Sequence, residues 1–189
     1  TYVTAGTYQI SISGSLPGWS FTSGTSGAGV SKTKITKIIQ WGDIGVTYAI
    51  NAFYGCANLN EIVDVCTWTA VTSFEYAFQN CTALTTIPSD LFSGCTAVTS
   101  FNGVFIDCSK LTTIGDNVFS GCTAVTSFQF VFSGCSKLTT IGDNVFSGCT
   151  AATNFSYAFS NCTTLTTIPS DLFSGCTAVT NFSYAFSNC

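Results

Sequence analysis

The amino-acid sequence predicts an α/β solenoid of about five coils, each about 27 residues long, behind an N-terminal β-rich cap. Three observations lead to this fold class. The same 27-residue phrase is written four times between Cys81 and Cys189, with small changes. Apolar residues recur at the same steps of every repeat, so stacked units can bury each other's apolar faces. Charged residues make up only 7% of the chain, far below the quarter that is usual in globular domains.

The repeated apolar positions form columns that are expected to face the interior. One coil supplies a leucine, an isoleucine, three phenylalanines and one further aliphatic residue, and the next coil supplies the same set. The columns are Leu84, Leu111, Leu138, Leu165; Ile87, Ile114, Ile141, Ile168; Phe92, Phe119, Phe146, Phe173; Phe78, Phe105, Phe132, Phe159, Phe186; Phe74, Phe101, Phe128, Phe155, Phe182; and Val71, Val98, Val125, Ala152, Val179.

Within a coil, the phrase LTTI is expected to form a short strand and the phrase SFxxAFxxC a helical or 3₁₀ turn. The helical interpretation rests on Phe74, Ala77, Phe78 and Cys81, which have the i, i+3, i+4, i+7 spacing of one helix face. A proline or glycine ends each strand at the same step, because neither continues a regular strand well. These residues are Pro88, Gly115, Gly142 and Pro169.

Residues 1–50 do not share the period and are expected to form the β-rich cap. TYVTAGTYQISISGSL alternates polar with β-branched or aromatic residues, and KTKITKIIQWGDI favours a further strand. A cap of this kind would cover the apolar end of the first coil. The solenoid then spans residues 51–189, with an irregular first coil at 51–80 and regular coils at 81–189.

Charge and hydropathy exclude several classes of partner. The net charge is −4, and the five basic residues are scattered lysines, whereas nucleic acids and anionic membranes require concentrated positive charge. No apolar stretch is long enough to insert into a membrane. The chain begins at Thr1, and its last repeat runs to Cys189 without an atypical, polar final unit. We therefore expect a piece of a longer array, or else a chain that self-associates through an uncapped C-terminal end.

Catalysis finds little support in the composition. The chain has neither His nor Arg, so the commonest general base and the usual phosphate clamp are missing, and we expect no enzyme and no cofactor. An aspartate follows the strand in each coil, which could indicate calcium, but Pro-Ser-Asp and Gly-Asp-Asn are ordinary turn sequences. We therefore expect no metal site at Asp90, Asp116, Asp143 and Asp171.

From Cys81 onward the cysteines recur in two columns with alternating spacings of 14 and 13 residues. One interpretation is a disulfide ladder from coil to coil, which stacked strands could reach at about 4.8 Å. The other is a set of small buried thiols, which we favour because side chains in one column point the same way. The odd total of 11 leaves at least one thiol without an internal partner.

The phrases LTTIPSDLFSGC and VTSFEYAFQNC resemble the repeats of BspA-like leucine-rich repeat bacterial surface proteins. The order VTSFEYAF, CTALTTI, VTSFNGVF is similar to a surface-protein repeat first catalogued in mycoplasma. The resemblance implies a leucine-rich repeat solenoid that is secreted or lies on the cell surface, and that adheres to matrix proteins, other cells or glycans. This chain has two cysteine phrases per repeat where the common BspA coil has one.

The function is therefore expected on the surface, in a non-enzymatic adhesion module that binds a protein or glycan of a host or neighbouring cell. The alternative is a structural protomer of a surface or phage-tail fibre, assembled end to end. A threonine pair lies between the Leu and Ile columns of each coil and could present a binding face, a plain soluble face or, less expectedly, an ice-binding one. The candidate residues are Thr85, Thr86, Thr112, Thr113, Thr139, Thr140, Thr166 and Thr167, with a second patch at Tyr76, Tyr157 and Tyr184 and with Phe130 at the same step. Residues of this second patch could contact a partner or equally pack between coils.

Overall fold

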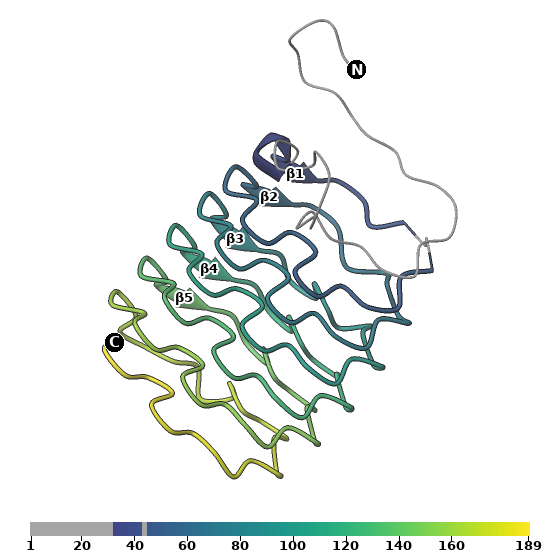
Figure 1. Cartoon of the computed structure of the whole chain (residues 1–189). Coiled ribbons are helices and arrows are strands. Elements are labelled where there is room, and N and C mark those ends of the chain that lie inside the picture. Colours follow the sequence, from purple (N-terminus) through teal and green to yellow (C-terminus); the bar gives the residue numbers. More distant parts are fainter. Residues whose placement is uncertain (1–31, 43–44) are drawn as a thin grey trace, which may run out of the picture.

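The computed structural model describes residues 32–42 and 45–189, which wind into an elongated stack of coils (Figure 1). A 3₁₀-helix, Lys32–Lys34, precedes two strands, β1 (Lys37–Ile38) and β2 (Glu61–Ile62), which pair in parallel. A second parallel sheet holds β3 (Thr86–Ile87), β4 (Thr113–Ile114) and β5 (Thr140–Ile141). Each of these pairs joins residues 27 positions apart, as Thr86 pairs with Thr113, so the sequence period is the coil length of the regular repeats.

Each regular coil has a second extended piece, about half a coil after the first. Single parallel bridges link Ser73, Ser100, Ser127, Asn154 and Asn181 in one continuous row. The row of strands and the row of bridges therefore run along two sides of the stack, and turns connect them. The two halves of a coil use the same sequence plan, since CTALTTI leads into the strand side and CTAVTSF into the bridge side.

The helical prediction for the phrase SFxxAFxxC is wrong: within the part of the chain that the structure describes, the 3₁₀-helix Lys32–Lys34 is the one helix. Residues 74–81 form successive turns instead. Every second N–H closes a turn onto the carbonyl three residues before, as from Ala77 to Phe74, and the N–H groups between them donate to the next coil, as from Phe78 to Val104 at 2.8 Å. A helix would use all these donors internally and would leave the coils unconnected.

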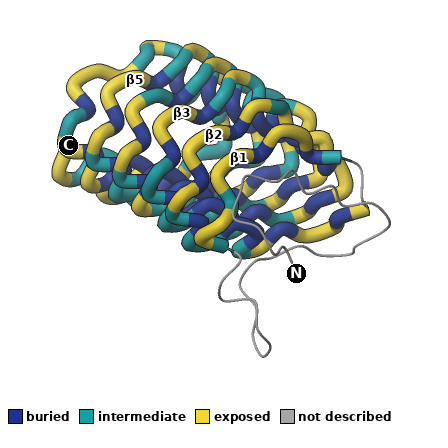
Figure 2. The backbone as a smooth tube through the Cα atoms, turned by 90° about the horizontal axis from the view of Figure 1, so that it is seen from above, coloured by how far each residue is buried: buried dark blue, intermediate teal, exposed yellow. Residues whose placement is uncertain are grey.

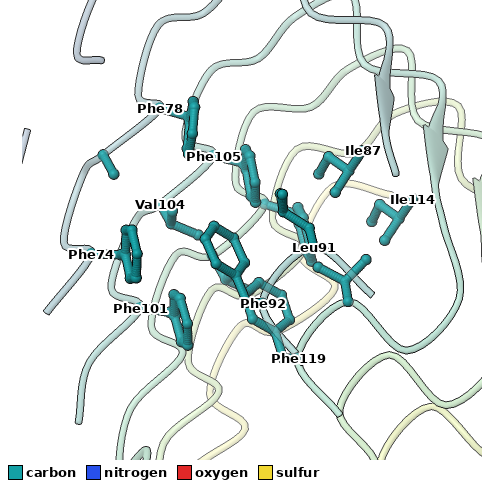
Figure 3. Packing of buried hydrophobic residues seen from close by; sticks show 14 of the residues in the cluster. Phe74, Phe78, Ile87, Leu91, Phe92, Phe101, Val104, Phe105, Ile114 and Phe119 are labelled. Carbon is teal, nitrogen blue, oxygen red and sulfur yellow. The ribbon is translucent and has the colours of Figure 1, made fainter. Parts of the chain in front are cut away.

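The aromatic columns predicted from the repeat form the core (Figure 3). Phenylalanine rings of one column stack face to face on those of the next coil, as Phe92 does on Phe119 at 5.6 Å between ring centroids. The Phe92 column also wedges between the other two, because Phe92 meets Phe101 at 4.9 Å with the ring planes tilted by 48°. Offset and tilted arrangements of this kind are the favourable ones for aromatic pairs.

The ends of the stack differ from its middle. Ile168 and Phe182 belong to buried columns but are 49% and 46% exposed, since no further described coil covers them. At the other end, residues 1–31 of the expected cap lie outside the described residues. Residues 32–42 of the same segment carry β1, whose pairing with β2 continues the stack, and this agrees with the strand expected in KTKITKIIQWGDI.

Two glycines offer a test of how closely the coils approach each other. A Cβ atom added to Gly115 would press against the backbone nitrogen of Ser89 and lie 2.8 Å from the carbonyl carbon of Pro88, whereas one added to Gly94 would meet nothing within 4 Å. We expect Gly115→Ala to lower the free energy of unfolding by about 2–3 kcal/mol, because backbone cannot yield as a side-chain tip does.

Gly94→Ala is the matched control for this variant, and its unfolding free energy should change by about 0.5 kcal/mol or less. Urea unfolding followed by circular dichroism measures both. An equal cost for the two substitutions would show that backbone contact between coils does not limit the fold.

Candidate functional site

The predicted threonine pairs line the strand side of the stack, where Figure 2 shows a largely exposed surface along the labelled strands. Thr113 is half-buried and the other seven are exposed. The first hydroxyl of a pair donates to the preceding coil, as from Thr112 Oγ1 to the Thr85 carbonyl at 3.0 Å and from Thr139 Oγ1 to the Thr112 carbonyl at 3.2 Å. The first threonines of the pairs, such as Thr112 and Thr139, thus help to hold neighbouring coils together. The second threonines, such as Thr86 and Thr140, face solvent.

A second threonine row on the bridge side was not singled out from the sequence. Each hydroxyl of this row donates to the threonine carbonyl of the preceding coil, at 3.1–3.3 Å. The signal was present in the sequence, because both halves of a coil carry a threonine directly after the leucine or valine of the interior. This row and the first threonines of the strand-side pairs therefore share a structural reason to be threonine. The members are Thr72, Thr99, Thr126, Thr153 and Thr180.

The predicted tyrosines occupy an unusual backbone position. Tyr76, Tyr157 and Tyr184 all have φ between 56° and 58°, and Phe130 at the same step of its coil has φ 58°. This left-handed region is uncommon for any residue with a side chain and is unfavourable for a bulky one. Each lies at the third position of a turn, the place that glycine or asparagine normally fills. We call the step Tyr76, Gly103, Phe130, Tyr157, Tyr184 the aromatic column.

Three members of the aromatic column stack on one another outside the core. The ring centroids of Phe130 and Tyr157 are 4.8 Å apart, and those of Tyr157 and Tyr184 are 5.0 Å apart, with planes within 19° of parallel. Tyr184 is 63% exposed and Tyr76 is 37% exposed. The rings cover each other's faces and present their edges and phenol oxygens to solvent, so the structure brings Tyr157 and Tyr184 together and leaves Tyr76 apart from them.

The opposite half of the coil shows what the same turn needs. Asp90 has φ 60°, and Asn117 and Asn144 have φ 55°. Their hydrogen bonds match those of the aromatic column: the Phe92 N–H donates to Val118 as that of Phe78 does to Val104, and the Ser93 N–H to Asp90 as that of Gln79 does to Tyr76. Asp and Asn tolerate this conformation best after glycine. The same turn can therefore be built without an aromatic residue.

One coil departs from the others at the aromatic column. Gly103 takes the place of the aromatic residue, and Ile106 replaces the polar residue found three steps later in the other coils, such as Gln79 and Ser133. A Cβ atom on Gly103 would lie 2.6 Å from Cδ1 of Tyr76 and 2.6 Å from Cδ1 of Ile106. The Tyr76 ring and the Ile106 side chain therefore close over this glycine.

The cysteines are free thiols, as favoured from their alignment in columns. From Cys81 onward, all but Cys95 donate S–H to the carbonyl of a phenylalanine in the preceding coil, at 3.2–3.3 Å. Burial raises the pKa of Cys149 and Cys162 to about 12, and the neighbouring thiols add to the shift. Such thiols are poor nucleophiles at neutral pH and serve as small hydrogen-bonding core residues.

Residues 32–42 and 45–189 contain no group of three or more His, Cys, Asp or Glu side chains that could hold a metal ion. The one helix in these residues, Lys32–Lys34, is not long and apolar enough to cross a bilayer. The aspartates of the strand side act in turns, as where the Asp143 N–H donates to Asp116 Oδ1 at 3.0 Å.

Parallel coils, repeated columns and hydroxyl rows together define a solenoid repeat protein. The chain belongs to the BspA-type leucine-rich repeat family, whose model matches residues 31–102 and 85–189 in six copies. Its fold is thus that of a repeat scaffold, as the sequence phrases suggested. Comparison with curated proteins gives no match.

Three solved structures resemble the chain at low similarity. A leucine-rich repeat protein of T. pallidum is 22% identical over 73% of each chain, with a TM-score of 0.31. One from Bacteroides ovatus is 17% identical over 83% of this chain and 77% of that chain, with a TM-score of 0.19. A leucine-rich cell surface protein of Faecalibacterium prausnitzii is 18% identical over 77% of this chain and 80% of that one, with a TM-score of 0.20. These scores are too low to transfer a ligand or a surface.

The buried thiols predict how stability depends on pH. Below pH about 9 the thiols are protonated in both the folded and the unfolded chain, so they contribute no pH dependence. As pH rises from 9 toward 12 only the unfolded chain releases protons, and each buried thiol lowers the unfolding free energy by about 1.4 kcal/mol per pH unit. Urea unfolding at a series of pH values above 8 should show this steep loss.

The double variant Cys149→Ala, Cys162→Ala supplies the control for this prediction. It removes two titrating thiols, so the slope above pH 9 should become shallower by about 2.8 kcal/mol per pH unit. An unchanged slope would mean that other groups cause the alkaline loss of stability.

Proposed function

We propose that this chain is an extracellular or cell-surface module that binds a protein partner, and that the aromatic column is its contact surface. Membership of the BspA-type family supports a scaffold of this kind. The resemblance of its repeats to those of bacterial surface proteins supports the location. The proposal assigns no chemical reaction to the chain.

The observation that carries the proposal is the left-handed backbone of aromatic residues outside the core, of which Tyr76 and Tyr184 are exposed and Phe130 and Tyr157 half-buried. Holding a bulky residue in this conformation costs about 1–3 kcal/mol. Stacking of the rings returns about 0.5–1.5 kcal/mol per pair, so at best it offsets the strain. Since Asn117 and Asn144 build the same turn on the other half of the coil, Phe130, Tyr157 and Tyr184 are not needed for folding. Their retention on the surface is best explained by binding.

The arrangement of the rings favours a protein over a glycan. Sugars stack on the faces of aromatic rings, but the faces that Phe130, Tyr157 and Tyr184 turn toward one another are covered, with ring centroids 4.8–5.0 Å apart. What remains exposed is a ridge of ring edges and phenol oxygens. Such rigid amphipathic groups are typical of contact points between proteins, where tyrosine is enriched. The threonine rows show no comparable backbone strain, because no threonine of the described residues has a positive φ.

Replacement of the column by asparagine tests this function. The triple variant Phe130→Asn, Tyr157→Asn, Tyr184→Asn copies the residues of the opposite turns, so its unfolding free energy should stay within about 2 kcal/mol of the parent. Peptides selected on the parent chain from a short-peptide display library should lose at least about tenfold in affinity for this variant. Fluorescence polarisation with the labelled peptides measures the loss.

The matched control changes the rival surface. Thr86→Ala with Thr140→Ala removes exposed hydroxyls from the strand side and should leave peptide affinity unchanged. If the peptides bind the asparagine variant as tightly as the parent, or follow the threonine variant, the aromatic column is not the contact surface. Light scattering of the same samples tells whether the chain self-associates, as a fibre protomer would.

A further inference from the structure

The coil that breaks the aromatic column points to one particular contact. We propose that the Gly103 step of the aromatic column, which has no aromatic side chain of its own, takes the planar, positively charged side chain of an arginine from the protein partner, held between Tyr76 and Phe130. We call this step the rung. This inference rests on the proposed function and goes beyond it by naming the recognised group and its place.

The spacing of the column gives the first argument. Parallel coils repeat at about 4.8 Å, and the rings of Phe130, Tyr157 and Tyr184 stack at that repeat. Tyr76 and Phe130 belong to coils two steps apart, with Gly103 between them, so their backbones are separated by about 9.6 Å. One planar group placed at the Gly103 step would have an aromatic face on either side, at the same distance as the rings have from one another.

The residues around Gly103 give the second argument. In the unbound structure the Tyr76 ring leans over Gly103 and shields it together with Ile106. The rung is thus kept covered by an apolar lining that no other coil has. Tyr76 is 37% exposed, and exposed side chains change rotamer within nanoseconds, so its ring can turn to admit a partner group. An aromatic side chain at this step would occupy the rung permanently, whereas at Gly103 only the side chains of Tyr76 and Ile106 cover it.

Charge at the rung selects the kind of planar group. Glu75 precedes Tyr76 and accepts a hydrogen bond from Ser100 Oγ at 2.7 Å. Asp107 is exposed, and its carboxylate leans over Gly134 in the coil of Phe130. Among the described residues the one ion pair joins Lys37 and Glu61, so neither Glu75 nor Asp107 has a cationic partner there. The other carboxylates of the regular coils lie on the opposite half, beside the strands.

Arginine satisfies all three conditions. Its guanidinium is planar, stacks on aromatic faces and donates hydrogen bonds to carboxylates. Lysine has the charge without the plane, and phenylalanine has the plane without the charge. Two cation–π contacts of about 0.5–1 kcal/mol each, aided by two carboxylates, place the affinity for a single arginine side chain in about the millimolar range.

The test uses small probes on the full chain. N-acetyl-arginine amide, its citrulline, lysine and phenylalanine counterparts are titrated into ¹⁵N-labelled protein, and the amide signals of Gly103 and its neighbours are followed by NMR. The arginine probe should shift these signals and bind at least about fivefold more tightly than the neutral citrulline probe, which has the same shape. Equal binding of the citrulline or phenylalanine probe would overturn the assignment.

Two variants locate the contact. Gly103→Tyr fills the rung in a conformation that Phe130 and Tyr157 already adopt, and should abolish the shifts. Glu75→Gln with Asp107→Asn keeps the volume and should weaken the arginine probe by roughly fivefold, while leaving the phenylalanine probe unaffected. Unchanged arginine binding in either folded variant would refute the site.

The same variants separate this inference from the function on which it rests. Should display-selected peptides bind Gly103→Tyr as tightly as the parent but fail on the asparagine variant of the column, the aromatic ridge is the contact surface and the empty rung is not a subsite. If both variants bind the peptides normally, the proposed function itself is wrong.

Discussion

Every second backbone N–H in the turns of a coil donates to a carbonyl of the following coil, and the rest of the structure depends on this hydrogen bond. It fixes the register, because Phe78 can meet Val104 only when the coils keep their length. It also dictates the turn geometry, since the N–H groups between must bond within the coil. Left-handed residues then appear at set steps, and the sequence must fill them with Gly, Asn or Asp or accept strain.

The side chains complete the pairing that the backbone begins. Carbonyl groups carry two acceptor positions, and an unsatisfied one in the interior costs free energy. Threonine hydroxyls donate to carbonyls on both sides of the stack, and cysteine thiols donate to the phenylalanine carbonyls inside it. This explains why two polarizable or hydroxylated residue types recur so strictly in a chain that has so few charges. The threonine side chains thus both keep the surface polar and donate hydrogen bonds to backbone carbonyls.

The sequence revealed those parts of the molecule that every coil shares. The phenylalanine columns and the LTTI strands follow from the period, because a stacked residue repeats its environment. Buried thiols were favoured for the same reason. The turn of residues 74–81 was misjudged, since the same helix-like spacing arises when the first and last residues of the turns 74–77 and 78–81 point inward. A hydropathy pattern does not show which carbonyl accepts the hydrogen bond of a given N–H group. In this turn every second N–H group donates to the neighbouring coil, and a local helix does not form.

The candidate site could not be found from periodicity, because it lies where residues differ from what the period requires. Tyr76 and Tyr157 were visible as repeated surface tyrosines, yet their importance became clear only with their backbone conformation and with Asn117 and Asn144 at the equivalent turns. In the sequence, Gly103 is one variation among many between repeats. The structure shows that its coil lies between the coils of Tyr76 and Phe130 and that the Tyr76 ring covers it. In a repeat scaffold, symmetry reports what folding needs, so recognition is best sought where one position accepts strain that its counterpart avoids, or where one coil leaves out what its neighbours supply.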